Sequence, residues 1–468
     1  MGPLLVETVV ADTMDGLRAA RDAVRHADIV ELRLDGVSGP DVPGALAGRR
    51  TPVIVTCRPT WEGGRFAGSE EERRRILADA LRLGAEYVDV EWRAGFESLI
   101  RHRGGARVVV SAHDFTGVPA GLPEQVRAMR ATGAEVVKVA VTAHRLCDSL
   151  SLAGATEGGR TVAIAMGPAG MPTRILAARF GSSWSYAGDG VAPGQIPAGR
   201  LVEEFRFREV SASTAVYGVV GGAAGASKSP GLHNAWFRRA GIDAVYVPMQ
   251  AAGFDDFLAF AHAMNVRGAS VTIPFKLDAL QRAAKVEESA RRVGAANTLR
   301  RMDGGWEAAN TDVAGFLAPF EAGGPAAAAS FDLRGRRATV LGAGGAARAV
   351  VVALLQAGAR PTVCARRVEQ ARGVASLGAG VGDWPPRPGS WDVLVNCTPL
   401  GGVSAPEASP LPGGPFGGRL VYDLIYQPEE TRLLREARAA GCATINGLPM
   451  LRAQAERQFE WWTKALCT

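Results

Sequence analysis

Lysine is scarce in this sequence of 468 residues, since Lys and Arg together number 53 and almost all of them are Arg. A lysine kept against this bias is a candidate for chemistry that arginine cannot perform, because lysine can lose its proton when buried and then act as a nucleophile or proton carrier. Lys138, inside the apolar run VVKVAV, and Lys276, at the end of VTIPFK, stand in the most suggestive settings. For any single lysine, chance survival under a GC-rich codon bias remains the alternative.

Cysteine pairs, long hydrophobic runs and clustered charge are also lacking. The six cysteines show no CxxC spacing, which favours reduced thiols and a cytoplasmic protein. No apolar run has transmembrane length, and no basic region precedes the apolar N-terminal stretch, so we expect neither a membrane span nor a signal peptide. The net charge of +6 comes from dispersed arginines, which favours anionic small molecules over nucleic acid. We assign no metal site.

Eight β-like runs alternate with amphipathic segments in the first part of the chain. This alternation predicts a parallel α/β domain over residues 1–208, and the number of runs favours a (β/α)₈ TIM barrel over an open doubly wound sheet of the same strands. The runs are residues 6–11, 28–35, 52–58, 87–92, 107–115, 136–141, 161–167 and 182–188.

The rest of the chain reads as a second, two-lobed α/β module. Strand-like runs at 214–220, 243–249 and 268–274 come first, and the Gly/Ala/Pro-rich segment 321–335 marks a joint. A strand, glycine turn and helix at 337–359 then indicate a Rossmann domain. The predicted domains are 1–208, 213–325 completed by the C-terminal helix within 445–468, and a Rossmann NADP-binding domain over 326–444.

Charged residues collect where the predicted barrel strands end, which is where barrel enzymes carry their chemistry. Each residue alone can belong to a solvated ion pair, which contributes about 0–1 kcal/mol to stability. Charge at six strand ends is harder to dismiss, because charge inside a barrel mouth must be paired or used. The residues are Glu31, Arg33, Arg58, Glu91 and His113 at strand ends, Lys138 within the sixth run, and Glu62, Arg174 and Gln195 in the loops.

These residue types predict imine chemistry. A buried lysine beside other cations loses its proton readily, and the neutral amine of Lys138 can attack a ketone. A histidine such as His113 can then take the proton from the adjacent carbon and protonate a leaving hydroxyl, while arginines bind a carboxylate. The pattern predicts loss of water from a carboxylated hydroxy-ketone, or an aldol-type reaction.

Residues 1–208 resemble type I 3-dehydroquinate dehydratases through ELRLD, TCRPTWEGGRF, SAHDF, VVKVAV, GPAGMPTRI and APGQ. The resemblance implies that Lys138 forms the imine, that His113 is the general acid/base and that Glu62 supports it. It also implies substrate contacts from Glu31, Arg33, Arg58, Arg174 and Gln195. Val191 stands where the family typically has Ser, so one substrate hydrogen bond is absent or supplied from elsewhere.

The glycine turn at 342–348, GAGGAAR, follows a strand and opens a helix. This arrangement is typical of a dinucleotide site, in which Gly342, Ala343, Gly344, Gly345 and Ala346 bring the backbone close to phosphates. The next strand ends at Arg366 and Arg367 instead of an acidic residue, which favours NADP over NAD. A plain Gly/Ala-rich turn and two surface arginines are the alternatives.

The second half resembles shikimate dehydrogenases over residues 215–468, through GVVGGAAGASKSPGLHN, VTIPFK, GAANTL, NTD, GAGGAAR, NCTPLGG, YDLIYQPEET and NGLPMLRAQA. The resemblance implies that Lys276 and Asp312 form the catalytic pair. It further implies shikimate contacts from Ser227, Ser229, Thr272, Asn297, Tyr426 and Gln454, and a nicotinamide pocket lined by Thr398, Gly447 and Met450. Ala365, Gly402 and the loop GGAAGAS depart from the usual family pattern.

Together these features predict a bifunctional enzyme of the shikimate pathway. It dehydrates 3-dehydroquinate to 3-dehydroshikimate through a lysine imine and then reduces that product to shikimate with NADPH. Its expected partners are small molecules, with no nucleic acid and no membrane. Two alternatives stay open. One is a second half that also accepts quinate, and the other is a ligand-sensing regulator that has lost its catalytic groups.

Overall fold

The computed structural model describes residues 2–321 and 331–464 and divides into two compact units, 1–266 and 267–468. Each unit is described by itself. Most of the expected joint at 321–335, including the domain boundary at 325/326, lies outside the described residues, as does the chain beyond Lys464.

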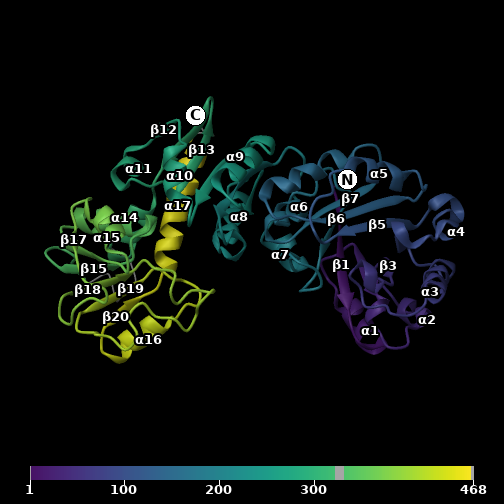
Figure 1. Ribbon diagram of the computed structural model, residues 1–468, viewed down its shortest axis with the longest axis horizontal. Coiled ribbons are helices and arrows are strands. Elements are labelled where there is room, and N and C mark those ends of the chain that lie inside the picture. Colours follow the sequence, from purple (N-terminus) through teal and green to yellow (C-terminus); the bar gives the residue numbers. More distant parts are fainter. Residues whose placement is uncertain (1, 322–330, 465–468) are drawn as a thin grey trace. The chain divides into compact units, whose positions relative to one another are not determined.

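Eight parallel strands form the first part of unit one and confirm the predicted barrel (Figure 1). The sheet order is β7-β6-β5-β4-β3-β2-β1-β8, and the barrel is nearly closed where the Ser183 N–H donates to the Thr161 carbonyl over 2.8 Å. The strands are β1 Leu4–Val10, β2 Ile29–Arg33, β3 Val53–Thr56, β4 Tyr87–Glu91, β5 Val108–Asp114, β6 Val136–Thr142, β7 Thr161–Met166 and β8 Trp184–Ala187.

Side chains alternate along each strand, so every second residue points into the barrel. The lower interior is apolar and includes Val6, Ile54, Val109, Ile164 and Trp184. Charged residues follow toward the carboxyl ends of the strands, as on β6, where Lys138 follows Val136 on the inward face. The flanking helices are α1 Met14–Ala23, α2 Val42–Leu46, α3 Glu70–Arg82, α4 Glu97–Ile100, α5 Leu122–Arg130, α6 Met171–Ile175 and α7 Ala198–Glu203.

Unit one continues past the barrel through β9 (Ala215–Gly221), α8 (Ser229–Arg239), β10 (Ala244–Gln250) and α9 (Phe254–Ala263), and β9 pairs with β10 in parallel. The carboxylate of Asp256 on α9 accepts hydrogen bonds from the backbone N–H groups of Leu146 and Cys147, each at 2.9 Å. The Arg179 guanidinium donates to the carbonyls of Thr214 and Met264. These bonds join the barrel to the segment that follows it.

Unit two begins with β11 (Val266–Val271), whose last five residues belong to it, and with an antiparallel hairpin of β13 (Thr298–Met302) and β14 (Gly305–Ala309). The hairpin has no counterpart among the predicted strands. Short elements surround it: α10 Lys276–Gln281, β12 Lys285–Val286, α11 Glu288–Val293 and α12 Asp312–Leu317.

The remaining strands of unit two confirm the predicted Rossmann arrangement. They form a parallel sheet in the order β17-β16-β15-β18-β19-β20. The strands are β15 Arg337–Leu341, β16 Arg360–Cys364, β17 Gly380–Val381, β18 Val393–Asn396, β19 Leu420–Asp423 and β20 Ala443–Ile445. The helices α14 (Gly345–Gln356), α15 (Val368–Ala375) and α16 (Arg432–Ala439) accompany them.

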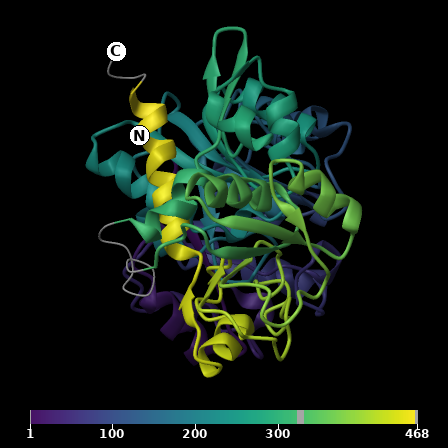
Figure 2. The same cartoon turned by 90° about the vertical axis from the view of Figure 1, so that its left-hand side faces the viewer.

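The long helix α17 (Leu448–Lys464) closes the described chain and is the yellow helix of Figure 2. It packs closely on α12, because a Cβ at Gly315 would lie 2.7 Å from the Gln454 Cβ. Only glycine permits this approach, which brings the start of α12 beside Gln454.

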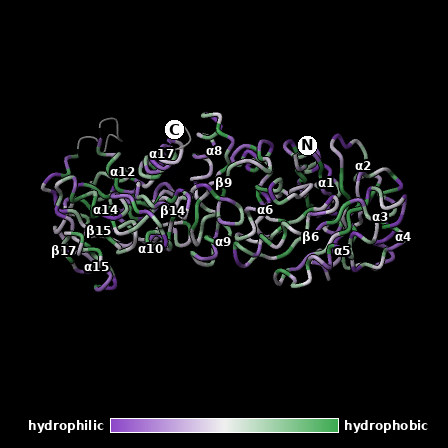
Figure 3. The backbone as a smooth tube through the Cα atoms, turned by 90° about the horizontal axis from the view of Figure 1, so that it is seen from above, coloured by the Kyte–Doolittle hydropathy of each residue, from purple (hydrophilic) through white to green (hydrophobic). Residues whose placement is uncertain are grey.

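Hydrophobic and hydrophilic residues are interspersed along the whole backbone (Figure 3). Within the residues that the structure describes, no helix is both long and apolar enough to cross a membrane.

Candidate active sites

Lys138 lies in the barrel interior and is 4% exposed. Its Nζ is 3.0 Å from Asp89 Oδ2 and 3.4 Å from Glu31 Oε1. Thr8 and Thr56 donate to the two oxygens of Glu31, at 2.8 and 2.9 Å, and fix that carboxylate. The amine is therefore held by carboxylates, whereas the residue types alone had suggested that cations surround it.

Arg58 stands behind these carboxylates and completes a buried charge network. Its guanidinium lies 2.9 Å from Asp89 and 2.7 Å from Glu91, and it donates to Ser111 Oγ at 2.8 Å. Burial alone would raise the pKa of Asp89, but Arg58 and Lys138 outweigh burial and hold that pKa below its ordinary value. Asp89 thus stays ionised and links the two cations.

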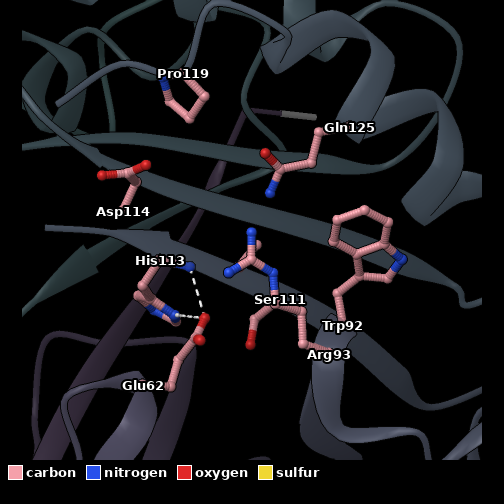
Figure 4. A pocket seen from close by; sticks show the side chains of 9 residues that line it. Glu62, Trp92, Arg93, Ser111, His113, Asp114, Pro119 and Gln125 are labelled. Atoms are coloured by element: carbon pink, nitrogen blue, oxygen red, sulfur yellow. Dashed lines mark hydrogen bonds and ion pairs between the residues drawn. The ribbon is translucent and has the colours of Figure 1, made fainter. Parts of the chain in front are cut away.

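His113 and Glu62 meet at the open side of this network. The Glu62 carboxylate accepts the His113 backbone N–H at 2.8 Å, and its Oε1 lies 3.3 Å from the imidazole Nδ1 (Figure 4). Burial, with Arg58 and Lys138 nearby, lowers the pKa of His113 well below 6.5. A neutral imidazole is the form that can accept a proton.

A cavity of about 120 Å³ opens beside His113 and Glu62. Its lining also includes Arg93 and Gln125, whose side chains approach the cavity in Figure 4. Neither residue was among the predicted site residues. The cavity gives a small molecule access to the imidazole.

Arg174 is a buried cation with no counter-ion in the part of the chain that the structure describes. The residue is 2% exposed, and its guanidinium donates to the Tyr186 carbonyl at 3.0 Å, while its Nε has no hydrogen-bond partner among the described residues. Burial lowers its pKa to about 10. Because a buried charge normally requires a partner, this guanidinium is suited to an anionic ligand such as a carboxylate.

The other predicted barrel residues lie near the strand ends. Arg33 forms a bidentate pair with Asp35, at 2.8 Å for both contacts, so its charge is already neutralised. Gln195 accepts the Ala192 N–H at 2.9 Å through its side chain and so braces the loop that carries Val191.

Lys276 and Asp312 form a second lysine centre, in unit two. The Lys276 Nζ lies 2.5 Å from Asp312 Oδ2, and Asn297 donates to the other oxygen of Asp312 at 2.8 Å. The same Asn297 amide lies 3.2 Å from Gln454 Oε1 and donates to Thr311 at 3.0 Å. The structure thus brings four predicted residues together: Lys276, Asn297, Asp312 and Gln454.

The glycine turn lies directly beside this lysine. A Cβ at Gly345 would lie 3.0 Å from the Lys276 Cδ, and Gly342 has a φ of +104°, which other residues rarely adopt. Helix α14 starts at Gly345 with no acidic residue in its first turn, so its N-terminus can receive a phosphate. These residues suit a dinucleotide whose reactive end approaches Lys276.

Two exposed arginines follow β16 at the position where a dinucleotide's ribose lies in this fold. Arg366 and Arg367 have no ion pair or side-chain hydrogen bond within the part of the chain that the structure describes. Their guanidinium groups are therefore available to a phosphate.

The strands β18 and β19 end close to the glycine turn. A Cβ at Gly342 would lie 3.1 Å from Thr398 Cγ2, and Asn396 accepts both the N–H and the hydroxyl of Thr398, at 2.9 and 2.7 Å. Gly447 packs against the Leu424 carbonyl, which a Cβ would approach to 2.1 Å. Met450 is buried, and Tyr426 is half-buried just after β19.

The remaining predicted residues, Ser227, Ser229 and Thr272, make local hydrogen bonds. Ser227 and Ser229 lie in unit one, where the Ser227 hydroxyl accepts the Ser229 N–H at 3.1 Å. Thr272 lies just before Lys276, and its carbonyl accepts the Phe275 N–H. No group of three or more His, Cys, Asp or Glu side chains among the described residues is arranged to hold a metal ion.

Asp89 is the main residue that sequence reasoning missed. It contacts both Lys138 and Arg58, yet it sits inside an apolar run without a motif of its own. The run YVDVE did contain a signal, because Asp89 and Glu91 are two apart and must share one face of a strand. Two carboxylates on an inward face require cations nearby.

A buried lysine in a barrel, followed by a Lys–Asp pair beside a dinucleotide turn, defines a two-centre α/β enzyme. Comparison with protein families matches residues 4–212 to type I 3-dehydroquinase and residues 219–299 to the shikimate dehydrogenase substrate binding domain. The chloroplastic bifunctional 3-dehydroquinate dehydratase/shikimate dehydrogenase of Arabidopsis thaliana is 32% identical over 98% of this chain and 82% of its own length. The chain belongs to this family of bifunctional enzymes.

Two further relatives match one or both halves. A shikimate dehydrogenase (NADP(+)) of Halorubrum lacusprofundi is 43% identical over 53% of this chain and 93% of its own length. A solved structure of dehydroquinate dehydratase and shikimate dehydrogenase from S. pombe AroM covers 99% of this chain and 96% of its own, with 23% identity and a TM-score of 0.41.

Proposed function

We propose that this chain converts 3-dehydroquinate to 3-dehydroshikimate in its barrel and reduces that product to shikimate with NADPH in its second module. One observation carries the proposal: the chain holds two separate lysine centres, Lys138 with Asp89 and Lys276 with Asp312. A regulator that had lost its catalytic groups would not need either pair, so the geometry favours an enzyme over a ligand sensor.

In the barrel, Lys138 first passes a proton to a neighbouring group, and its amine then adds to the substrate ketone. The carbonyl oxygen leaves as water, and the nitrogen remains as a protonated imine. Neutral His113 removes the proton from the adjacent carbon and then returns it to the departing hydroxyl, while Glu62 keeps the imidazole oriented. The unpaired guanidinium of Arg174 receives the substrate carboxylate.

In the second module, Asn297 and Gln454 lie beside the catalytic pair and can bind substrate hydroxyls. Lys276 and Asp312 exchange the proton that accompanies reduction of the ketone. The glycine turn, Arg366 and Arg367 would hold NADP(H), which supplies the hydride when bound. We further propose a cytoplasmic location, which the five unpaired cysteines of the described chain support.

Substitution of each lysine separates the two reactions. With 3-dehydroquinate and NADPH present, enone absorbance reports dehydration and cofactor oxidation reports reduction. Lys138→Ala should abolish dehydration but still reduce added 3-dehydroshikimate, and Lys276→Ala should do the reverse. Lys285→Ala, at an exposed lysine paired with Glu307, is the matched control and should retain both steps. Loss of both reactions in a folded single variant would contradict the two-centre proposal.

A further inference from the structure

The face of an aromatic ring closes a third side of the Lys138 amine. The Lys138 Nζ lies 4.2 Å from the centre of the Tyr186 ring, on strand β8. Asp89 and Glu31 occupy two other sides, at 3.0 and 3.4 Å. Lys138 on β6 and Tyr186 on β8 lie near opposite ends of the sheet order, and they meet because the barrel closes where β8 reaches β7.

Tyr186 contacts this amine through its ring alone. The side chain is 3% exposed, and its hydroxyl has no hydrogen-bond partner among the residues that the structure describes. Burial, followed by the nearby Glu31 and Asp89 charges, raises the pKa of this hydroxyl well above 10, so it stays protonated. The hydroxyl therefore adds no counter-charge at the amine, and the ring face is the part that acts on it.

We propose that Tyr186 is a positioning residue for the imine, whose ring face holds the cationic nitrogen of Lys138 against Asp89 and Glu31. This inference rests on the proposed lysine imine. A ring face attracts a cation, and the attraction is strongest where water is excluded. Imine formation exchanges the carbonyl oxygen for the nitrogen, releases water and leaves the positive charge on that nitrogen, so the ring faces a cation before and after the step.

The ring supplies the uncharged side of this site. The charged groups nearest Lys138 are Glu31 from β2, Asp89 from β4 and His113 from β5, while Arg58, just after β3, pairs with Asp89. Replacing Tyr186 leaves these charged residues unchanged. It withdraws stabilisation from the cationic imine nitrogen, so the imine should form more slowly.

Borohydride trapping of the full-length protein with 3-dehydroquinate, measured by mass spectrometry, tests the proposal. Tyr186→Leu should reduce the rate of adduct formation roughly tenfold. Tyr186→Phe keeps the ring and should restore the rate of the unmodified protein. Trp184→Phe, on the same strand and facing the same interior, is the control for a changed core and should leave the trapping rate unchanged.

Several outcomes would overturn the inference. If Tyr186→Leu traps at the rate of the unmodified protein, the ring does not act on the amine; if Tyr186→Phe is as impaired as Tyr186→Leu, the hydroxyl is the active group. Should Tyr186→Leu fail to fold, phenylalanines of increasing fluorination at position 186 preserve the shape and weaken the ring's attraction for cations. Trapping must then slow with each fluorine. Failure of the unmodified protein to give any adduct would instead reject the imine itself.

Discussion

Burial and the nearest charges set the state of each ionisable side chain in the barrel. His113 is the clearest case, because its side chain is only 13% exposed and lies near Arg58 and Lys138, and both cations oppose a further positive charge. The pKa of His113 therefore falls well below 6.5, and the imidazole is neutral in the ligand-free protein.

This neutral state predicts where dehydratase activity is lost on the acidic side of its pH–rate profile. A base must be unprotonated to act, so activity is lost as pH falls through the lowered pKa of His113. The kcat/KM for 3-dehydroquinate should stay level as pH is lowered past 6.5 and fall only well below that value. A limb centred at 6.5 or above, measured in buffers of constant ionic strength, would show that His113 is not the controlling base.

Glu62 orients the same imidazole without reaching the amine. In Glu62→Gln the amide oxygen can still accept the His113 backbone N–H, so the fold should survive while the negative charge beside Nδ1 is lost. We expect kcat for dehydration to fall roughly ten- to hundredfold, with little change in KM, because the charge matters most when the imidazole is protonated. Glu97→Gln, at an exposed site in α4, is the control and should leave kcat and KM for dehydration unchanged. An effect confined to KM would assign Glu62 to substrate binding instead.

The sequence predicts much of this site but not its internal contacts. Alternation along VVKVAV places Lys138 inside the barrel, and His113 ends its run in the same way. The contacts of the amine depend on which residues of β2, β4 and β8 stand level with β6 after the strands tilt and close. That register is a property of the whole barrel, which is why Asp89 and Tyr186 had no visible link to Lys138.

At the level of elements, helices and strands carry the cofactor site, and their ends determine which groups face a ligand. Strand β16 ends before Arg366 and Arg367, and α14 begins at Gly345. Both features follow from local sequence, since a β-branched run stops at charged residues and the glycines permit the turn. The β13–β14 hairpin was missed because its strands, TLRRM and GWEAA, alternate weakly and carry charge.

The two arginines after β16 predict the choice of cofactor. Replacing both Arg366 and Arg367 by Gln removes charge-assisted hydrogen bonds worth about 1.5–3 kcal/mol each. The KM for NADPH should rise roughly a hundredfold while that for NADH changes little, because NADH lacks the ribose phosphate. Arg360→Gln, exposed at the start of the same strand, controls for loss of surface charge. An equal rise for both cofactors would refute a phosphate contact.

At the scale of the molecule, the compact unit that contains the barrel does not stop where the barrel does. It extends to residue 266 and includes β9, β10 and α9, although composition placed a break near 208. A composition shift marks a change of sequence character, whereas folding units follow buried contacts. Here buried polar contacts cross the break. Asp256, which follows the break, accepts N–H groups of the barrel segment after β6. Arg179, which precedes the break, donates to the Met264 carbonyl, which follows it.

Because Asp256 joins the barrel to residues 213–266, we expect both to unfold in one thermal transition. Its carboxylate is 3% exposed and accepts three backbone N–H groups, from Leu146, Cys147 and Ala252. Asp256→Asn places an amide against donors, which should cost about 2 kcal/mol and lower the Tm by roughly 5 °C. Dehydratase and dehydrogenase activities should be lost in the same heating step, since residues 213–266 carry Ser227 and Ser229.

The matched control is Glu157→Gln, an exposed carboxylate of the same unit outside the joint, which should leave the Tm unchanged. Residual activity after heating, assayed separately for the two reactions, follows each module through the transition. Two well-separated losses in Asp256→Asn, with only the dehydrogenase destabilised, would show that the barrel is stable without this contact. Loss of both activities in a single step at a lower temperature would establish that the buried carboxylate couples the barrel to the strands that follow it.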